Sequence, residues 1–288
     1  MEIINANENK ELFINLFNRY VIYAPYTVKL DDNTLTRHIL GFGAHKENRA
    51  LIGSQGSEYG IIHFGMHDEN SGIIYLLFSD SNQMAVDLIK TAEIWFAEKK
   101  IKKIKAYLGF PSPYQYILHG SEPYCWAGNY HANNAFRRMG YDLDLDILVM
   151  SRKLHQEHTA FGQDDFIIRE NTERDDELTL SGKFTAYKNS EWAGNCGYHY
   201  LKALSRQLGK KYGQIDIWLD EAFHGTILSK ALLSMAHGAL IRLGVEQVML
   251  ATNQSLFRAV KFYEKTGYTP EPIKAYSYVK TLLANMGE

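Results

Sequence analysis

The sequence is poor in cysteine and carries almost no excess charge of either sign. Only two cysteines, Cys125 and Cys196, occur in 288 residues, and they stand far apart. A disulfide framework or a structural zinc site needs more cysteines than this, so we expect no metal. The formal net charge is −2, which leaves no basic field to attract nucleic acid or anionic lipid. We therefore expect no nucleic-acid partner.

Long apolar runs are also missing. No uninterrupted stretch approaches the ~20 residues that a membrane-spanning helix needs. Residues 1–7 contain neither a basic nor a long apolar region, so no signal peptide is expected. The remaining composition, 45% hydrophobic and 22% charged, is typical of a globular protein. We expect a cytoplasmic protein with no membrane partner, and its length suits two domains.

Hydrophobic periodicity predicts a similar order of elements in both halves of the chain. In the first half we expect a helix over 8–20, strands over 59–67 and 73–78, a helix over 82–99, a strand over 103–108, a short helix over 131–139 and a strand over 146–151. In the second half we expect strands over 166–169 and 214–220, a helix over 226–243, a strand over 245–251 and a helix over 256–264. The pattern predicts no element over 191–212.

The ends of the two halves can be aligned. Gly140 and Gly267 are each followed by tyrosine, and an alanine, Ala132 or Ala259, precedes each glycine at the same distance. Between its long helix and this glycine the first half is longer, and the aromatic loop over 109–126 accounts for the surplus. An internal repeat with one loop insertion is the simplest explanation.

The repeat predicts a module over residues 1–154 and a second module over residues 165–288. Residues 155–164 lack periodicity and are expected to form the linker. The tyrosines and prolines of the loop over 109–126 have two interpretations: they line an acceptor pocket, or they cover the contact between the modules.

The order strand, tight turn, long helix, strand, short helix and Gly-aromatic pair resembles the GNAT (N-acetyltransferase) superfamily. In that family the turn has the form R/Q-x-x-G-x-G/A, and here it is His224-Gly225-Thr226-Ile227-Leu228-Ser229. The later family pattern, T-N-x-x-x-x-x-A-x-x-x-Y-E-K-x-G-F/Y, corresponds here to Thr252-Asn253 through Ala259 and on to Phe262-Tyr263-Glu264-Lys265-Thr266-Gly267-Tyr268. The resemblance is close over about 214–270 and weaker elsewhere.

The resemblance implies an α+β fold of two GNAT-like modules. Each would hold a mixed, largely antiparallel sheet with a splayed pair of parallel strands and flanking helices. It also implies an N-acetyltransferase that moves an acetyl group from acetyl-CoA, its co-substrate, to an amine acceptor by direct attack in a ternary complex. We expect the acceptor to be a small molecule, and the oligomeric state is left open.

The resemblance assigns the site to the second module. Tyr263 would protonate the departing thiolate, Asn253 would hydrogen-bond the pantetheine or a water, and Asp216 would take the acceptor's proton through water. The residues expected to bind the cofactor are Leu219, His224, Gly225, Thr226, Ile227, Leu228, Ser229, Lys230, Asn253 and Phe262. Simpler interpretations stand beside these: Tyr263 as a packing aromatic, Asn253 as the end of a strand and Asp216 as surface charge.

Physical chemistry supports this assignment. A helix N-terminus presents unpaired N–H groups and a partial positive charge, which suit the pyrophosphate of coenzyme A. Small residues in the preceding turn let the backbone approach the phosphate oxygens. A tyrosine near the sulfur can protonate a thiolate whose conjugate acid has a pKa of ~8.5.

Departures from the family pattern weaken the assignment. His224 replaces Arg or Gln, Ile227 replaces the first glycine of the turn, and Ser229 replaces its last small residue. The first module departs further, because Asp80 and Phe136 stand where an anion-binding residue and the tyrosine are expected. We interpret that module as a structural or substrate-shaping copy.

Two other functions follow from the same residues. A GNAT pair with an altered turn can be a catalytically inactive module that recognises CoA, a small ligand or a protein partner. An acyl-CoA donor other than acetyl-CoA is also compatible, since nothing in the sequence fixes the size of the acyl pocket.

Overall fold

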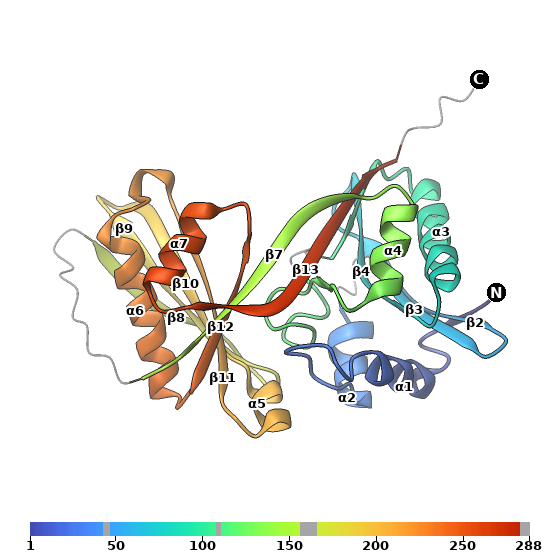
Figure 1. Cartoon of the computed structure of the whole chain (residues 1–288), viewed down its shortest axis with the longest axis horizontal. Helices are drawn as coiled ribbons and strands as arrows, with labels where there is room; N and C mark the ends of the chain where they lie inside the picture. Colours follow the sequence, from blue (N-terminus) through green and yellow to red (C-terminus); the bar gives the residue numbers. More distant parts are fainter. Residues whose placement is uncertain (43–46, 108–110, 156–165, 283–288) are drawn as a thin grey trace. The chain divides into compact units, whose positions relative to one another are not determined.

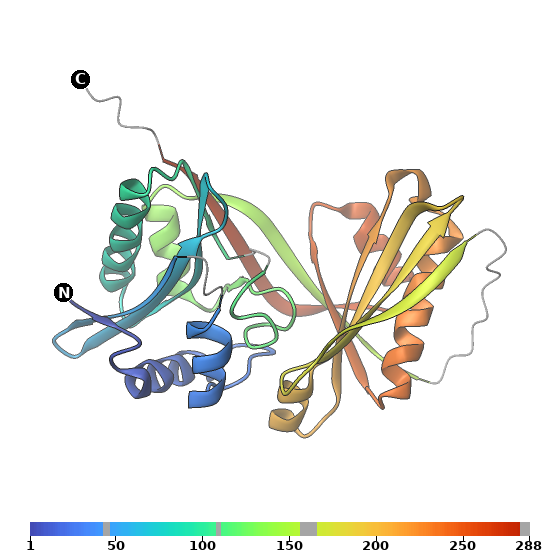
Figure 2. The ribbon, with the colours of Figure 1, turned by 180° about the vertical axis from the view of Figure 1, so that it is seen from behind.

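A computed structural model describes residues 1–42, 47–107, 111–155 and 166–282 (Figures 1 and 2). The chain divides into two compact units. Unit 1 contains Met1–Ile147, Asn253–Ser255 and the chain from Ile273 on. Unit 2 contains Leu148–Thr252 and Leu256–Pro272.

Unit 1 is a sheet in the order β1-β2-β3-β4-β5-β13, in which β4 and β5 are parallel and the other neighbours antiparallel. The helix α3 (Asn82–Glu98) packs on the sheet through buried apolar residues at helical spacing, including Leu88, Ala92 and Phe96. Its other elements are β1 (Glu2–Asn5), α1 (Lys10–Tyr20), α2 (Asp32–Thr34), the π-helix η1 (Leu35–Leu40), β2 (Asn48–Gln55), β3 (Glu58–Met66), β4 (Ser71–Ser79), β5 (Lys103–Ala106), β6 (Cys125–Trp126) and α4 (Tyr130–Arg138).

Unit 2 repeats this arrangement with the sheet order β7-β12-β11-β10-β9-β8. The helices α6 (Ile227–Arg242) and α7 (Phe257–Lys265) lie on one face of the sheet (Figures 1 and 2). The core between them includes Ile215, Leu232 and Val248. The remaining elements are β8 (Ile167–Asp175), β9 (Leu180–Lys188), β10 (Glu191–Tyr200), α5 (Lys202–Leu208), β11 (Tyr212–Leu219), the 3-10 turn η2 (Glu221–Phe223) and β12 (Gln247–Asn253).

Two long strands, β7 (Asp142–Lys153) and β13 (Thr269–Thr281), each contribute to both units. The 13 residues of β13 span about 40 Å, which is long enough for the strand to take part in the sheets of both units. The end of β13 pairs with β5, where Tyr278 faces Ala106. The compact units therefore differ from the predicted stretches 1–154 and 165–288, since the chain from Ile273 on belongs with unit 1. Of the predicted linker only His155 lies within the described residues.

The predicted fold class is confirmed: mostly antiparallel sheets, each with one parallel pair, covered by helices. Most elements predicted from periodicity occur within a few residues of their expected bounds, but the strand predicted over 166–169 extends to Asp175 as β8, and the expected strand end at Leu108 falls outside the described residues. The region 191–212, for which no element was predicted, forms β10, α5 and the start of β11.

Candidate functional site

The two parallel strands of unit 2 separate partway along their length. Pairing between β11 and β12 runs from Tyr212–Gln247 to Gln214–Met249, and both strands continue beyond it. The N–H of Asp220 points the other way, to the carbonyl of Ala193 in β10. Because N–H directions alternate along a strand, the N–H groups of Ile217 and Leu219 point into the opening between β11 and β12.

The connection over 220–226 leads from this opening to the N-terminus of α6. Gly225 has φ +76°, and an added Cβ would meet no atom within 4 Å. Thr226 caps the helix: its hydroxyl accepts a hydrogen bond from the Leu228 N–H (3.3 Å) and donates one to the Phe223 carbonyl (2.8 Å). The turn is therefore open at Gly225 and fixed at Thr226.

The first turn of α6 carries four of the ten predicted cofactor residues, from Ile227 to Lys230. Ile227 is 52% exposed, while Leu228 and Ser229 are buried and Lys230 is exposed. The N–H groups of the first helical turn have no partner within the helix, which leaves those of Ile227 and Ser229 as donors. His224 folds back, with Nε2 3.3 Å from the Leu219 carbonyl oxygen.

The residues predicted from β12 and α7 are placed differently from one another. Tyr263 is 7% exposed and lies in the core of unit 2 beside Tyr268, with ring centroids 5.8 Å apart. Phe262 is half-buried against the same core. Asn253 ends β12 and accepts a hydrogen bond from the Ser255 N–H (3.0 Å), and it groups with unit 1. The predicted roles of Tyr263, Phe262 and Asn253 stay predictions.

Asp216 has a partner that the sequence reasoning missed. His199 on β10 lies with Nε2 2.7 Å from Asp216 Oδ2, on the sheet face opposite the core residue Ile215. A Cβ at Gly197 would come within 2.7 Å of the same oxygen, so glycine makes room for the carboxylate. His199 is 5% exposed, and it stands in the region for which no strand was predicted. An assigned β10 would have placed its side chain beside β11.

The surroundings of Asp216 favour its ionised form. Burial by itself would raise the pKa of this carboxyl, but hydrogen bonds from His199 and the Gly197 N–H, with the charges of His199 and Lys183, lower it below its usual value. The neighbouring thiol of Cys196 behaves oppositely, because burial and the negative charge of Asp216 raise its pKa well above the usual value. Cys196 is thus a protonated core residue and a poor nucleophile.

In unit 1 the corresponding opening between parallel strands is filled. Pairing of β4 with β5 ends at Ile74–Ala106, and the next residue, Tyr107, has φ +60°. Its hydroxyl accepts a hydrogen bond from the Leu77 N–H and donates one to the Leu77 carbonyl, both 3.1 Å. The Asn129 amide donates a further bond to that carbonyl (2.8 Å). Leu77 stands as far beyond the last pair as Ile217 does in unit 2, and its backbone is already bonded.

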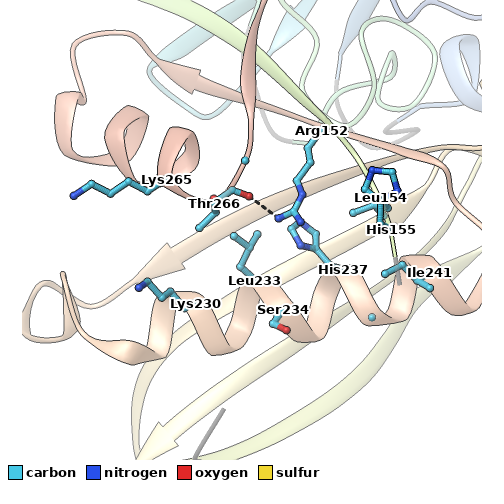
Figure 3. Close-up of a pocket in the computed structure, with 12 residues that line it drawn as sticks. Arg152, Leu154, His155, Lys230, Leu233, Ser234, His237, Ile241, Lys265 and Thr266 are labelled. Carbon is cyan, nitrogen blue, oxygen red and sulfur yellow. Dashed lines mark hydrogen bonds between the residues drawn. The ribbon is translucent and has the colours of Figure 1, made fainter. Parts of the chain in front are cut away.

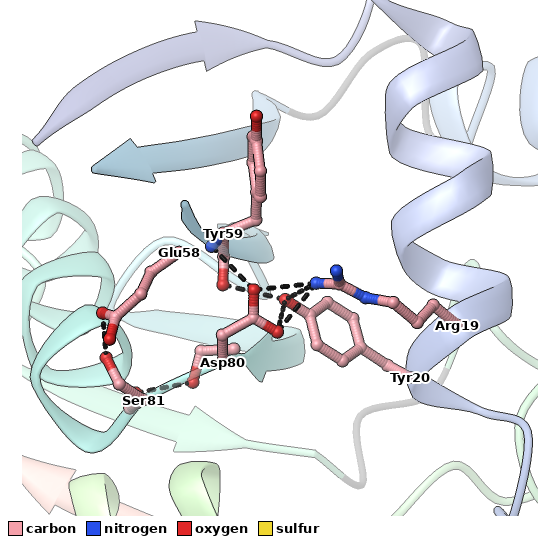
Figure 4. Close-up of polar contacts among 7 residues, drawn as sticks. Arg19, Tyr20, Glu58, Tyr59, Asp80 and Ser81 are labelled. Atoms are coloured by element: carbon pink, nitrogen blue, oxygen red, sulfur yellow. Dashed lines mark hydrogen bonds and ion pairs between the residues drawn. The ribbon is translucent and has the colours of Figure 1, made fainter. Parts of the chain in front are cut away.

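The N-terminus of α3 in unit 1 also carries its own anion (Figure 4). Both carboxylate oxygens of Asp80 accept hydrogen bonds from Arg19 (2.7 and 2.8 Å). The Tyr59 N–H (2.8 Å) and the Tyr20 hydroxyl (3.1 Å) bind the same carboxylate. Ser81 caps the helix and donates to Glu58 (2.6 Å). Two carboxylates therefore occupy the surroundings of this helix end.

Within the described part of the chain, no group of three or more His, Cys, Asp or Glu side chains has the arrangement of a metal site. The helices of the same residues include none long and apolar enough to cross a bilayer.

Comparison with known proteins agrees with this geometry. Residues 149–268 match the acetyltransferase (GNAT) family. A tandem GNAT protein from the clavulanic acid biosynthesis pathway has 11% identity and a TM-score of 0.68, covering 97% of this chain and 98% of that one. A GCN5-related N-acetyltransferase from Sphaerobacter thermophilus has 14% identity and a TM-score of 0.61, covering 97% and 95%. Among curated proteins none matches the sequence. The chain has the tandem GNAT fold, as the resemblance predicted.

Proposed function

We propose that the protein is an N-acetyltransferase that moves an acetyl group from acetyl-CoA to an amine acceptor, with its active site in unit 2. The observation that carries the proposal is the opening between β11 and β12 beside the N-terminus of α6. Backbone donors at both places suit a ligand with a pyrophosphate at one point and a thioester at another.

The cofactor would lie along these donors. Its pyrophosphate would face Gly225 and the N–H groups of Ile227 and Ser229, which have no partner within the helix. Its pantetheine arm would enter the opening between β11 and β12, where the N–H groups of Ile217 and Leu219 are directed. An N–H group there would stabilise the negative charge that develops on the thioester oxygen during attack.

The acceptor amine would attack the thioester carbon directly. It must lose a proton, and Asp216, held by His199, would take it through a water molecule. The carbon–sulfur bond then breaks, and Tyr263 would protonate the departing thiolate. The high pKa of the Cys196 thiol supports a mechanism without a covalent enzyme intermediate.

Unit 1 is proposed to hold no cofactor. The hydroxyl of Tyr107 is hydrogen-bonded to the backbone N–H and carbonyl of Leu77, which a pantetheine arm would need as partners. The carboxylate of Asp80 would repel a pyrophosphate. We infer that unit 1 is a structural or substrate-shaping copy.

Calorimetry with acetyl-CoA and with CoA tests this function. We expect one site per chain and a rise in melting temperature, because a ligand that binds only the folded protein stabilises it. Gly225→Val should weaken binding at least tenfold, since a side chain there blocks close approach of the phosphates.

Gly209→Val is the matched control. Gly209 ends α5 with φ +65° and also has no atom within 4 Å of an added Cβ, so the backbone strain is similar. Absence of binding at millimolar acetyl-CoA would exclude both the cofactor site and the enzyme. Equal weakening by the two glycine variants would exclude the proposed position of the pyrophosphate.

A further inference from the structure

The α6 side of the unit 2 sheet is taken up by the core and by the cofactor proposed above. A hollow of about 450 Å³ runs along α6 on that side, with Lys230, Leu233 and His237 among its lining residues (Figure 3). Lys230 belongs to the first turn of α6, so the hollow adjoins the predicted cofactor residues. An acceptor therefore has the opposite face of the sheet from which to approach the opening between β11 and β12.

On β11 this opposite face carries Asp216 and Trp218. Side chains alternate along a strand, and Ile217 and Leu219 pack against the core, so Asp216 and Trp218 project from the other face. Trp218 is 65% exposed, and the Asp216 side chain is 28% exposed. Their Cα atoms are separated by about 7 Å along the strand. Ile217, whose N–H points into the opening, stands between them.

Two further aromatic residues project from the same face. Trp192 on β10 is 43% exposed and pairs with Tyr187 on β9. Tyr187 follows the core residue Ala186, so the Tyr187–Trp192 pair lies on the side away from the core, as Trp218 does. Aromatic side chains from three neighbouring strands thus share a face with the carboxylate of Asp216, and we call this group the open face.

Charge on the open face favours a cationic ligand at Asp216. The surroundings of this carboxyl favour its ionised form, as described above. The basic side chains nearby have partners of their own: Lys183 forms an ion pair with Glu173, and the Arg169 guanidinium lies 5.5 Å from the centre of the Tyr187 ring. A partly exposed carboxylate attracts an ammonium group through charge-assisted hydrogen bonds.

Unit 1 has an aromatic residue at the position of Trp218, but there it is covered. Phe78 stands as far beyond the last β4–β5 pair as Trp218 does beyond the last β11–β12 pair. Phe78 is only 5% exposed, because α1 packs on it: its ring centroid lies 6.1 Å from that of Phe17 and 5.5 Å from that of Tyr20. In unit 1 the chain between β1 and β2 supplies this helix, whereas in unit 2 β8 passes to β9 through the short turn 176–179.

We propose that the open face, formed by Asp216, Trp218, Trp192 and Tyr187, binds the acceptor, and that the acceptor is an amine that carries an aromatic ring. This inference rests on the proposed function and names the class of its second substrate. The ammonium group would lie beside Asp216, next to the opening that admits the thioester, and the ring would stack on Trp218. Aromatic pairs contribute more than their buried area alone, and an indole face also attracts a nearby cation.

Calorimetry with 2-phenylethylamine on the CoA-saturated protein tests the proposal. Ethylamine lacks the ring and 3-phenylpropionate replaces the ammonium by a carboxylate, so each should bind about tenfold or more weakly. Trp218→Ala and Asp216→Asn should each weaken 2-phenylethylamine binding by about tenfold. Trp218→Phe should retain most of the affinity, because phenylalanine keeps an aromatic ring on the strand.

Tyr130→Ala is the control, because Tyr130 is an exposed aromatic residue (72%) on α4 of unit 1, and its loss should leave the affinity unchanged. Absence of 2-phenylethylamine binding at millimolar concentration, equal weakening by Tyr130→Ala and Trp218→Ala, or equal binding of 3-phenylpropionate would overturn the proposal. Tighter, Trp218-dependent binding of glucosamine would overturn the aromatic class of the acceptor, since a sugar ring would then be the natural partner of the indole.

Failure of this inference can be told apart from failure of the proposed function. If CoA does not bind, the same titrations on the free protein still test the open face. Trp218-dependent binding of 2-phenylethylamine without any acetyl transfer to it would contradict the enzyme and retain the ligand site. Acetyl transfer to other amines, together with 2-phenylethylamine binding that Trp218→Ala does not change, would contradict the open face and leave the proposed function standing.

Discussion

The two units connect a strand to a long helix in the same topological position but leave the helix N-terminus in different states. In unit 1 the connection consists of Asp80 and Ser81, and the Asp80 carboxylate is bound by Arg19 beside α3. In unit 2 the connection over 220–226 is longer and presents Gly225 and the capping Thr226. A helix N-terminus attracts an anion in both cases. Unit 1 supplies that anion itself, as the Asp80 carboxylate, and unit 2 leaves the N-terminus of α6 open to a ligand.

The openings between the parallel strands differ in the same way: the opening in unit 1 is closed by its own side chains, and the opening in unit 2 is not. Leu77 in unit 1 has its backbone N–H and carbonyl bonded to Tyr107. Ile217 in unit 2 lies at the corresponding position beyond the last β11–β12 pair. Topology alone therefore does not produce a binding site. In unit 1 the side chains of Tyr107 and Asn129 form hydrogen bonds with the backbone of Leu77, which the fold would otherwise offer to a ligand.

The largest expected difference between the units is catalytic. Tyr263→Phe removes one oxygen, and once an acceptor is known it should lower the rate of the chemical step by about 10²-fold or more, the usual size of a general-acid contribution. Phe136→Tyr adds an oxygen at the matching place in unit 1 and should leave turnover almost unchanged. Rapid-quench measurement of the chemical step, with CoA affinity and melting temperature as fold controls, gives both values.

Two outcomes would contradict this expected difference between the units. A parental rate for Tyr263→Phe, with chemistry rate-limiting, would make Tyr263 a packing residue. A large change in turnover for Phe136→Tyr would place part of the active site in unit 1.

Sequence reasoning predicted the elements with strong periodicity and the turn with local motif character. The helices α3 and α6 depend on patterns among neighbouring residues, and so does the turn from His224 to Ser229. These features can therefore be predicted from short stretches of sequence. The features that close unit 1 depend on residues far apart. Arg19 and Asp80 are 61 residues apart and Tyr107 and Leu77 are 30 apart, and no local pattern connects them.

The missed parts of unit 2 have similar causes. In β10 the two glycines at 194 and 197 interrupt the alternation of apolar and polar residues, which hid both the strand and His199. The sharing of β13 between the units depends on tertiary pairing with β5, and strand periodicity does not specify a partner. The predicted site residues from Leu219 to Lys230 lie together, but the catalytic roles rest on the family resemblance.

A smaller difference is expected in stability. Asp80→Asn removes the negative charge that binds Arg19 and several hydrogen bonds. The side chains of Arg19 and Asp80 are 51% and 27% exposed, so solvent screening reduces the effect and we expect a loss of about 1 kcal/mol. Asp220→Asn is the matched change in unit 2, where the carboxylate accepts the Ala222 N–H (2.9 Å). It should cost less.

Urea denaturation of the two variants measures this contrast. A loss for Asp220→Asn as large as that for Asp80→Asn would mean that the unit 2 turn is as firmly closed as that of unit 1. Binding of acetyl-CoA at a second site in Asp80→Asn would show that charge alone had kept unit 1 empty, in spite of Tyr107.

The smallest expected effect concerns Ile227, the bulky residue at the first position of α6. Its side chain is half exposed and stands where the family has glycine, so it crowds the place proposed for the pyrophosphate. Ile227→Gly should tighten CoA binding by a few-fold, although glycine costs a helix up to ~1 kcal/mol. Ile94→Gly is the control from unit 1, because Ile94 is 63% exposed on α3 and its replacement should lower stability without changing CoA affinity. Weaker CoA binding by a folded Ile227→Gly variant would show that the isoleucine contacts the cofactor productively, and the open turn of unit 2 would then be shaped for its ligand by Ile227 and not in spite of it.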